Sequence, residues 1–307
     1  MHHLRPTFAL LLGCAAPLVA QDPNLTMRIQ QVAPRFQLIS GYYNGNILVL
    51  QGKEGLLLVD GQSTKRVGQA DSALRSVTTL PVKVLVSTHY HGDHLEGNAF
   101  WKKQGAKLIA QAQLVEEAKK DTTIPEREWH RPAASPDMLP DETFTDSMQL
   151  DFEGEPVVLL HPPAAHTRGD AIIWFPKANV IHTGDILERE APPFIDWWAG
   201  GTLDGMIAGC DRILALINNT TVVVPGHGTP TDKAGLARYR QMLVAGRERI
   251  APLVAAGQTD EAIVASRPFR EWEGDLGGER RAGQLITQIT FGMRRFVALR
   301  PRARIPT

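Results

Sequence analysis

Short runs of apolar residues recur along this chain, and each ends at a polar or glycine-containing segment. The runs at 46–50 and 56–60 are joined by a short loop that contains Gly52 and Gly55, which is typical of a β-hairpin. The run at 82–86 is nearly uninterrupted, as expected for a strand that is buried on both faces of a sheet. Further strands are predicted at 107–110, 148–152, 157–161, 171–175, 180–183 and 221–224.

Stretches with apolar residues at helical spacing separate several of these strands, which indicates an α/β fold. Ser63 is placed to cap the first helix, whose apolar stripe runs from Val67 to Val77. Thr202 starts a longer helix, and Cys210 lies on its apolar face. We expect Cys210 to pack in the core rather than to bind a metal. Helices are predicted at 63–77, 98–104, 114–119 and 202–217.

Two long amphipathic helices are predicted near the C-terminus, one from Leu236 to Leu253 and one from Leu285 to Phe296. We interpret residues 236–307 as a helical extension that packs on the main domain. A contact with a second copy of the chain, in a homodimer, is left open for this extension.

Two segments show neither the apolar runs of strands nor the apolar spacing of helices. Residues 121–140 contain four prolines among polar residues. A long irregular insertion in a compact domain is either a functional loop or a passive one, so we keep both interpretations, a flap near a site and a surface loop. The Pro- and Gly-rich segment 191–201 contains the adjacent Trp197 and Trp198. These could cap the edge of the core or form an apolar wall for a substrate.

The loop after the buried strand, residues 87–94, reads STHYHGDH. Neutral imidazole and carboxylate oxygen are the ligands that zinc takes where thiolates are absent. His89 and His91 are two residues apart, so both can point toward one ion in extended backbone. Asp93 and His94 lie beyond a glycine, where a turn could direct them at a second ion. Three imidazoles and a carboxylate so close together predict a metal site rather than a solvated turn.

The spacing His89-x-His91-x-Asp93-His94 resembles the metal-binding signature of the metallo-β-lactamase superfamily. Later positions of the family pattern have matches in the same order, and the resemblance covers residues 35–235. These matches are His166 in PPAAHTRGD, Asp185 in HTGD and His227 in PGHG. The resemblance implies that residues 21–235 form a four-layer αββα metallo-β-lactamase sandwich.

The resemblance also implies a site for two zinc ions. The implied ligands fall into two sets and one bridge: His89, His91 and His166; Asp93, His94 and His227; and Asp185. A water between the ions, with its pKa lowered toward about 7, would then be the hydroxide nucleophile of a hydrolase. Asp93 would additionally orient this hydroxide.

The residue at the bridging position bears on the substrate. Members of the superfamily that hydrolyse β-lactams have Cys or Ser where Asp185 stands, whereas a bridging Asp resembles the glyoxalase II-like thioesterases and the lactonases. We therefore expect a hydrolase of an ester, thioester, lactone or amide bond in a small molecule, with β-lactam hydrolysis as the alternative. An iron-dependent oxidoreductase of the same superfamily is a further alternative. A binding module without catalysis is the weakest, because it needs no such ligand set.

The charge balance argues against one class of partner, and the N-terminal segment predicts the compartment of the protein. Lys and Arg total 33, as do Asp and Glu, and no basic run stands out, which argues against nucleic acid as a partner. Residues 1–20 combine a basic start, a short apolar centre and small residues before Gln21, as in a secretory signal peptide. We expect a periplasmic or secreted protein. The sequence leaves open whether cleavage follows Ala20 or Cys14 carries a lipid anchor.

Two further histidines, His161 and His182, fall inside or at the ends of predicted strands. We interpret both as packed histidines or as hydrogen-bond partners of the metal ligands, not as direct ligands. Such partners orient a ligand ring and so contribute to metal binding without touching the ion.

Overall fold

The computed structural model describes residues 27–41, 44–125 and 128–297. The predicted signal peptide, residues 1–20, and Cys14 lie outside these ranges, so neither the cleavage site nor the lipid anchor is placed. Within the described ranges, no helix is long and apolar enough to cross a membrane.

The larger of the two main sheets has seven strands, in the order β1–β2–β3–β4–β5–β6–β9. Its strands are β1 (Arg28–Ala33), β2 (Phe36–Ser40), β3 (Ile47–Gln51), β4 (Leu56–Val59), β5 (Val82–Ser87), β6 (Lys107–Gln111) and β9 (Glu142–Phe144). The first four pair antiparallel, and β4, β5, β6 and β9 run parallel. The predicted hairpin and the strands after it are confirmed. The outer strands β1 and β9 have few buried residues, so no apolar run marks them in the sequence.

The smaller sheet has five strands, in the order β10–β11–β12–β13–β14. Its strands are β10 (Ser147–Phe152), β11 (Glu155–Leu160), β12 (Ile172–Phe175), β13 (Val180–His182) and β14 (Val222–Val224). All neighbours pair antiparallel except β13 and β14, which run parallel. The predicted strands are confirmed with small shifts at their ends. The parallel pairing brings the C-terminal ends of β13 and β14 to the same edge of the sheet.

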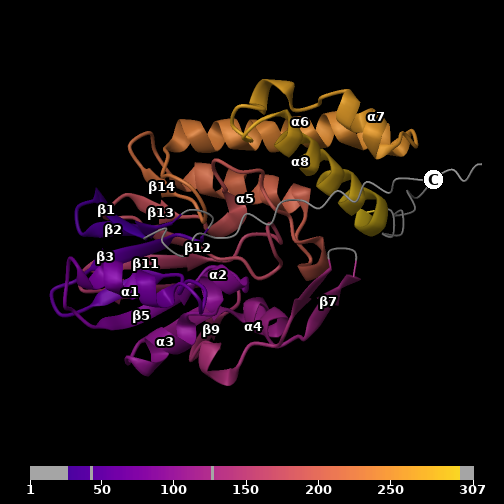
Figure 1. Ribbon diagram of the computed structural model, residues 1–307. Helices are drawn as coiled ribbons and strands as arrows, with labels where there is room; N and C mark the ends of the chain where they lie inside the picture. The colour runs from indigo at the N-terminus through magenta and orange to yellow at the C-terminus, as the bar shows by residue number, and fades with distance from the viewer. Residues whose placement is uncertain (1–26, 42–43, 126–127, 298–307) are drawn as a thin grey trace, which may run out of the picture.

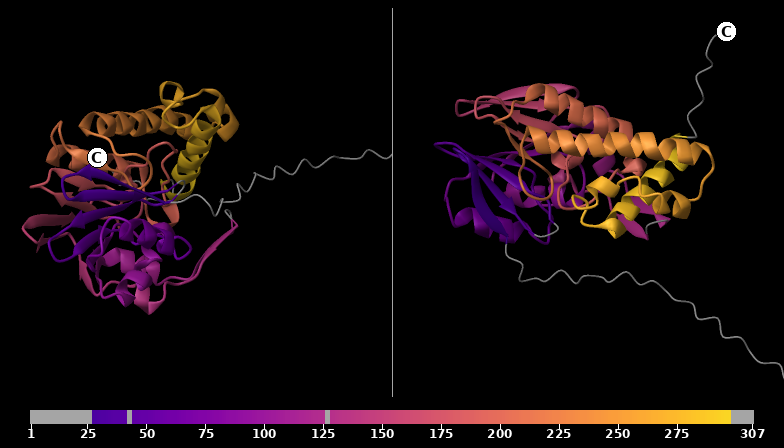
Figure 2. Two further views of the ribbon diagram at one scale, coloured as in Figure 1. Left: turned by 60° about the vertical axis from the view of Figure 1, so that its left-hand side comes forward. Right: turned by 90° about the horizontal axis from the view of Figure 1, so that it is seen from above.

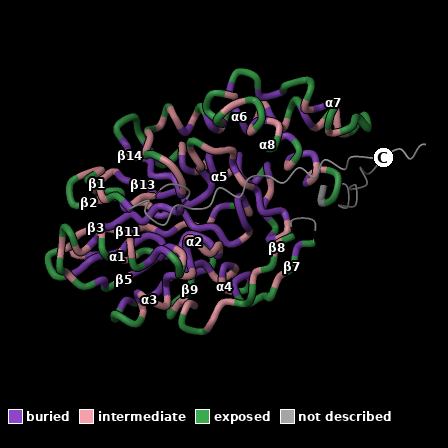
Figure 3. The backbone as a smooth tube through the Cα atoms, in the orientation of Figure 1, coloured by how far each residue is buried: buried purple, intermediate pink, exposed green. Residues whose placement is uncertain are grey.

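The two sheets pack face to face and helices cover their outer faces, which gives the four-layer αββα sandwich (Figure 1). Phe36 and Phe175, one from each sheet, meet edge-to-face in the core between the sheets. Helices α1 (Val67–Arg75) and α3 (Asn98–Lys103) cover the larger sheet, and α5 (Leu203–Leu216) covers the smaller one. Buried positions concentrate in the sheets between these helices (Figure 3).

Helix α1 is shorter than its apolar pattern predicts. It ends at Arg75, so Val77 lies beyond it with 47% of its surface exposed. The β-branched residues at 77–79 and the proline at 81 disfavour a further helical turn. The short helices α2 (Gly92–Leu95) and α4 (Ala112–Ala118) follow β5 and β6.

The C-terminal extension is helical, as predicted. It consists of α6 (Lys233–Ala255), α7 (Asp260–Ala265), α8 (Glu279–Gly292) and short helical turns at Arg270–Trp272 and Met293–Val297. These helices lie over α5 (Figures 1 and 2), and α5, α6 and α8 share one apolar core with the smaller sheet. Cys210 of α5 is buried in this core and is free, which confirms its predicted packing role.

Residues 121–140 are more regular than the sequence analysis predicts. Strands β7 (Thr122–Ile124) and β8 (Trp129–Arg131) pair as an antiparallel hairpin, and the 3-10 turn η2 (Pro136–Met138) follows. The hairpin projects from the body of the sandwich (Figure 1). Strands of three residues among prolines and polar residues have too little periodicity to be recognised in the sequence.

Candidate metal centre

The seven predicted ligands lie at the edge of the sandwich where the parallel strands of both sheets end. They are His89 and His91 after β5, Asp93 and His94 on α2, His166 between β11 and β12, Asp185 after β13, and His227 after β14. The structure brings all of them together in two neighbouring groups. We call one group the first ligand set (His89, His91 and His166) and the other the second ligand set (Asp93, His94 and His227).

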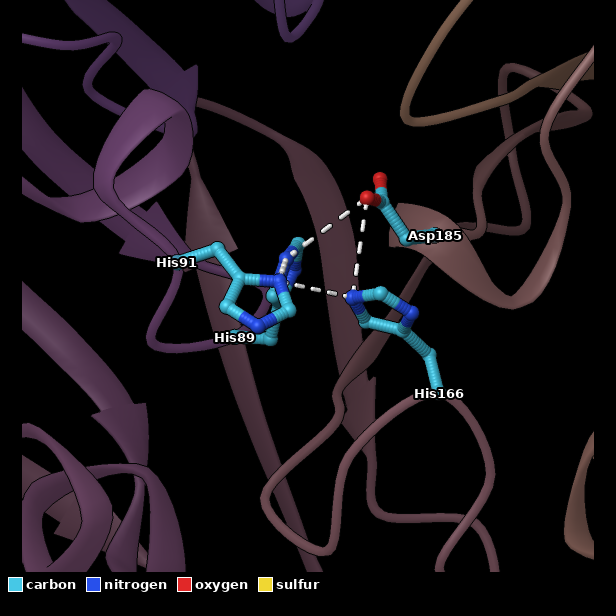
Figure 4. A group of neighbouring side chains, drawn as sticks. All are labelled: His89, His91, His166 and Asp185. Atoms are coloured by element: carbon cyan, nitrogen blue, oxygen red, sulfur yellow. Dashed lines mark hydrogen bonds and ion pairs between the residues drawn. The ribbon is translucent and has the colours of Figure 1, made fainter. Parts of the chain in front are cut away.

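The ring nitrogens of the first ligand set converge on one point (Figure 4). Nδ1 of His91 lies 3.1 Å from Nε2 of His89 and 2.9 Å from Nε2 of His166. Oδ2 of Asp185 lies 3.7 Å from Nε2 of His89 and 3.6 Å from Nε2 of His166. These four donor atoms are close enough to share one ion.

Two rings of the first set have a hydrogen-bond acceptor at their outer nitrogen. Nδ1 of His166 lies 2.7 Å from the carbonyl oxygen of Phe194, which can only accept a hydrogen bond. The Phe194 backbone is itself held, because its N–H donates to Glu188 at 2.9 Å. Nε2 of His91 lies 2.9 Å from a carboxylate oxygen of Asp196. In their neutral forms both rings therefore carry the proton on the outer nitrogen and a lone pair on the inner one.

Asp60 and Thr88 orient one ring of each ligand set. Oγ1 of Thr88 donates to Oδ2 of Asp60 at 2.8 Å, and it therefore accepts from Nδ1 of His89 at 3.0 Å. Nδ1 of His94 donates to the same Asp60 oxygen at 2.8 Å. The neutral forms of His89 and His94 then also direct the lone pair of Nε2 inward.

This arrangement suits a cation. Lone pairs of neutral rings that face one another at hydrogen-bond distance repel unless a positive charge lies between them. The donors are imidazole nitrogens and carboxylate oxygens without a thiolate, a combination that zinc accepts. Acceptors at the outer ring nitrogens are the usual support of metal-binding histidines. The residues present therefore fit a metal ion.

The second ligand set is more open to solvent than the first. Nε2 of His227 lies 3.2 Å from Nε2 of His94 and 3.2 Å from Oδ2 of Asp93. The side chain of Asp93 is 32% exposed and that of His227 is 20% exposed, whereas His94 is fully buried. Asn46 holds the loop that carries His227, because its side-chain amide donates to the carbonyl oxygens of Pro225 and Gly228, both at 2.9 Å.

Asp185 joins the two sets. Besides its contacts with the first set, its Oδ2 lies 3.3 Å from Nε2 of His227, and its Oδ1 lies 3.4 Å from Nε2 of His94. Oδ1 is buried and has no hydrogen-bond partner among the described residues. Gly226 allows this packing, since a Cβ atom there would lie 1.8 Å from Oδ1. A buried carboxylate that contacts both sets, with one oxygen that makes no hydrogen bond, fits a bridging ligand.

The two sets differ in charge. Burial lowers the pKa of His89 and brings that of His166 to about 4. In the second set, burial also tends to lower the pKa of the rings, but nearby carboxylates outweigh it. Asp185 has the largest effect among these carboxylates. They raise the pKa of His94 to about 9 and that of His227 well above its ordinary value. Although burial opposes it, His227 and His94 in turn hold the pKa of Asp185 well below its usual range.

Asp196 contributes to the centre and is not found by the sequence analysis. Its Oδ2 accepts hydrogen bonds from the Tyr90 hydroxyl and from Nε2 of His91. Its Oδ1 caps the turn η4 (Trp197–Ala199) by accepting from two backbone N–H groups. The Arg131 guanidinium lies over the Tyr90 ring, 4.5 Å from its centroid, and links β8 to this network. No local pattern marks Asp196, because its partners come from distant parts of the chain.

A cavity of about 230 Å³ opens beside the centre. It is lined by His91, Gly92 and Asp93, by Ile124 and Trp129 of the β7–β8 hairpin, and by Phe194 and Asp196. The hairpin thus forms part of the wall of the site. This placement supports the interpretation of residues 121–140 as a flap and not as a passive surface loop.

The adjacent tryptophans have a structural role. Trp197 is buried in the core under α5 and lies against Gly292 of α8. The ring of Trp198 is half-buried beside Phe291, with 5.3 Å between the ring centroids. Of the two predicted roles, capping of the core edge is therefore confirmed. The apolar wall of the cavity comes instead from Phe194 in the same segment.

His161 and His182 lie outside both ligand sets. Nδ1 of His161 lies 2.8 Å from the carbonyl oxygen of Asp170. Nδ1 of the buried His182 accepts from the N–H of Gly184 at 3.1 Å, directly before the turn that carries Asp185. Both are packed histidines, as predicted, and His182 also supports the position of a candidate ligand.

Comparisons with known proteins point to one family. The family model described as "Metallo-beta-lactamase superfamily" matches residues 41–227. The chain is 25% identical over 186 residues to the metallo-beta-lactamase IND-1 of Chryseobacterium indologenes, across 60% of this chain and 72% of that protein. It is 23% identical over 240 residues to a linear primary-alkylsulfatase of Pseudomonas sp. (strain ATCC 19151), across 66% of this chain and 44% of that protein. The solved structure of a metallo-beta-lactamase from Pontibacter korlensis matches with a TM-score of 0.59 at 19% identity, over 71% of this chain and 99% of that one.

Proposed function

Because the chain belongs to the metallo-beta-lactamase superfamily, we propose that it is a hydrolase that holds two zinc ions and cleaves an ester, thioester, lactone or amide bond in a small molecule. The observation that carries this proposal is the pair of ligand sets joined by Asp185. Each set offers three donors and a share of this carboxylate. A catalytic zinc with so few protein ligands keeps a position for water or substrate.

Donor chemistry supports zinc as the metal. The two sets contain imidazole and carboxylate donors, which zinc accepts, but imidazole also suits iron. An iron-dependent oxidoreductase is therefore the outcome that metal analysis has to exclude. A single, tightly held iron ion in the purified protein would contradict the hydrolase proposal.

The proposed roles of the chain's own residues follow from their positions. When bound, the two ions would lower the pKa of a water between them and polarise the bond to be cleaved. Asp93 belongs to the second ligand set and also lines the cavity, so its carboxylate can orient the attacking water toward a substrate there. Asp196 and the Phe194 carbonyl hold His91 and His166 in place.

Hydrolysis of β-lactams is the second candidate, and the similarity to the metallo-beta-lactamase IND-1 favours it. Asp185 weighs against it, because the resemblance drawn from the sequence places Cys or Ser at this position in the β-lactamases of the superfamily. We therefore rank the general hydrolase first.

An activity panel tests the proposal. The zinc-loaded protein that starts at Gln21 is assayed against a lactone, a thioester and a β-lactam. We expect turnover of the lactone or the thioester that a chelator abolishes and added zinc restores, and that Asp93→Asn strongly reduces. Turnover of the β-lactam alone would favour the second candidate. An absence of turnover of all three at full zinc content would contradict lactone, thioester and β-lactam hydrolysis.

Export is a separate part of the proposal, and the composition of residues 1–20 supports it. A reporter fused to the full-length chain should leave the cytoplasm, whereas the same fusion without residues 1–20 should remain inside. Fatty-acid labelling that is lost in Cys14→Ser would identify a lipid anchor. Equal retention of both fusions in the cytoplasm would contradict export.

A further inference from the structure

The β7–β8 hairpin forms a two-stranded sheet of its own beside the metal centre. Ile124 and Trp129 are directly paired across it, and both line the cavity next to the metal-binding side chains. A lone two-stranded hairpin is at best marginally stable in water. Contacts between the hairpin and the rest of the domain therefore have to hold these two side chains in the wall of the cavity.

Arg131 of β8 connects the hairpin to the C-terminal end of α4. Its Nη2 donates to the carbonyl oxygen of Glu117 at 2.7 Å, and its Nη1 donates to that of Ala118 at 3.2 Å. The carbonyl groups of the last helical turn carry a partial negative charge, so a guanidinium is a favourable partner for them. Nη2 also lies 3.4 Å from the hydroxyl of Thr122, which is paired with Arg131 across the hairpin. One guanidinium thus joins both strands to the helix.

The same guanidinium contacts the loop that carries two ligands of the first set. Its central carbon lies 4.5 Å from the centroid of the Tyr90 ring, and its Nε is buried without a hydrogen-bond partner among the described residues. A guanidinium over the face of an aromatic ring is attracted by the π electrons. Tyr90 stands between His89 and His91 in the chain, is buried, and donates to Asp196. Its ring is therefore a fixed support for the hairpin.

The end of α4 is itself fixed to a second ligand loop. The buried carboxylate of Glu117 pairs with the guanidinium of Arg168, two residues after His166. Gly169 of the same loop packs so closely on α4 that a Cβ atom there would lie 2.5 Å from a backbone nitrogen of the helix. Both supports of Arg131, the end of α4 and the Tyr90 ring, thus belong to segments that are tied to metal-binding histidines.

A further ion pair of the hairpin segment does not give such an attachment. Nε2 of His130 lies 3.0 Å from Oδ1 of Asp121, but the two side chains are 54% and 66% exposed. Exposed ion pairs contribute little to stability. Both partners also lie in or next to the hairpin, so their pairing does not connect it to the sandwich.

We propose that Arg131 is a positioning residue that holds the hairpin in place, so that Ile124 and Trp129 contact the substrate beside the metal centre. The role in catalysis rests on the hydrolase function above, whereas the role in holding the hairpin does not. Arg131 is not among the described residues that line the cavity, so it acts through the two that are. Apolar contacts of this kind are made to the substrate before and during the reaction, so their loss should raise KM more than it lowers kcat.

Three variants test the proposal. Arg131→Met removes the charge and every donor, and Arg131→Lys keeps the charge but not the planar fork. The matched control is His130→Gln, which removes the exposed ion pair from the neighbouring position of the same strand. Arg131→Met should fold, because the carbonyl oxygens at the end of α4 keep backbone donors. The N–H groups of Lys120 and Ala134 donate to them at 3.1 and 2.8 Å.

The position of the hairpin is followed by fluorine NMR after labelling with 5-fluorotryptophan, and the Trp129 signal is identified by its absence in Trp129→Phe. In Arg131→Met we expect this signal to move toward its position in the urea-unfolded protein. Both zinc affinities should stay within about threefold, while KM rises about tenfold and kcat changes less than about threefold. Arg131→Lys should give an intermediate change, and His130→Gln should leave the signal and KM unchanged.

An unmoved Trp129 signal in Arg131→Met, or an equal movement in His130→Gln, would overturn the proposal. Loss of zinc or of the folded state in Arg131→Met would also overturn it, because Arg131 would then support the domain as a whole and not the hairpin. Movement of the Trp129 signal in a protein that turns over none of the panel substrates would count against the hydrolase function and leave the positioning of the hairpin intact. Turnover together with an unmoved Trp129 signal would do the reverse.

Discussion

The two ligand sets of the metal centre use similar side chains in different electrostatic surroundings. In the first set, burial keeps the pKa of His89 and His166 below the ordinary value, so these rings are neutral at physiological pH. In the second set, neighbouring carboxylates raise the pKa of His94 and His227, so these rings hold a proton when no metal is present. One half of the centre is thus ready to bind a cation, and the other half must first release protons.

The difference arises from what surrounds each ring. The acceptors at the outer nitrogens of His89 and His166 are a hydroxyl and a carbonyl oxygen, which carry no full charge. All three rings lie near Asp185, but only His94 also has a carboxylate, that of Asp60, at its outer nitrogen. Two ligand sets of similar composition can therefore differ in affinity and in pH dependence because of the residues that support them.

Asp185→Asn is expected to have the largest effect, because this carboxylate contacts both sets. Asn keeps the size of the side chain but removes the charge that both ions would share. We expect the zinc content to fall toward one ion per chain and turnover to fall more than about 100-fold, beyond the roughly 10–100-fold that loss of an orienting partner costs. Elemental analysis and steady-state kinetics measure these effects.

Asp170→Asn is the matched control for this change. Asp170 is also buried, and it accepts hydrogen bonds from the backbone and hydroxyl of Thr167, but it contacts no ligand nitrogen with its side chain. Burial raises its pKa to about 7, so an amide changes its charge less than it changes that of Asp185. Equal zinc loss in both variants would show that the effect of Asp185→Asn is general and not specific to a bridge.

Asp196→Asn is expected to weaken the first set selectively. The variant replaces one of the two carboxylate oxygens by an amide group that cannot accept the hydrogen bonds from Tyr90 and His91. We expect the affinity for one of the two zinc ions to fall about 10–100-fold, as for other partners of metal-binding histidines. Competition with a chromophoric chelator measures both affinities. A lower melting temperature with unchanged zinc affinities would instead assign Asp196 a purely structural role.

The pH dependence of zinc binding should separate the two sets. His94 has a pKa of about 9 without metal, so binding must displace its proton at any lower pH. His227, whose pKa is also raised, must lose a proton as well. The affinity of the second set should therefore fall with decreasing pH by up to about tenfold per pH unit for each proton that the metal displaces. His166, with a pKa of about 4, stays neutral across the same range and adds no such dependence to the first set. Chelator competition between pH 6 and 9 that shows parallel slopes for both ions would contradict this comparison.

Tyr90→Phe is expected to have the smallest effect. Burial and the neighbouring Asp196 carboxylate raise the pKa of Tyr90, so its hydroxyl stays protonated and donates to Asp196. Its removal leaves Asp196 in place and takes away one hydrogen bond, which contributes about 1.5–3 kcal/mol when one partner is charged. We expect zinc affinity to change only a few-fold and thermal stability to fall. A loss of zinc as large as in Asp196→Asn would contradict this expectation and show that Asp196 positions His91 only when the Tyr90 hydroxyl is present.

The part of the centre that the sequence predicts best is local. His89 and His91 share one loop at a spacing that suits one ion, and that loop follows an apolar run that is recognisable as a buried strand. His166 and His227 lie far from this loop in the chain. They were predicted only because their order resembles the pattern of a known family.

The supporting residues could not be predicted, because their contacts depend on the tertiary structure. Asp196 meets His91 across 105 residues, and Asp60 meets His94 across 34. The same limit applies to the fold. Most strands with buried apolar runs were found, although β2, whose apolar run is broken by Gln37, was missed. Strand β1 and the β7–β8 hairpin have too few apolar residues to produce a pattern.

X-ray absorption spectroscopy of the zinc-loaded protein tests the central claim, two ions joined by Asp185, most directly. The account predicts two zinc ions per chain and a metal–metal distance of about 3.5–4 Å, the usual separation in two-metal sites. It also predicts that this scattering contribution disappears in Asp185→Asn and persists in Asp170→Asn. A single metal ion per chain, or two zinc ions with no metal–metal contribution, would contradict the account.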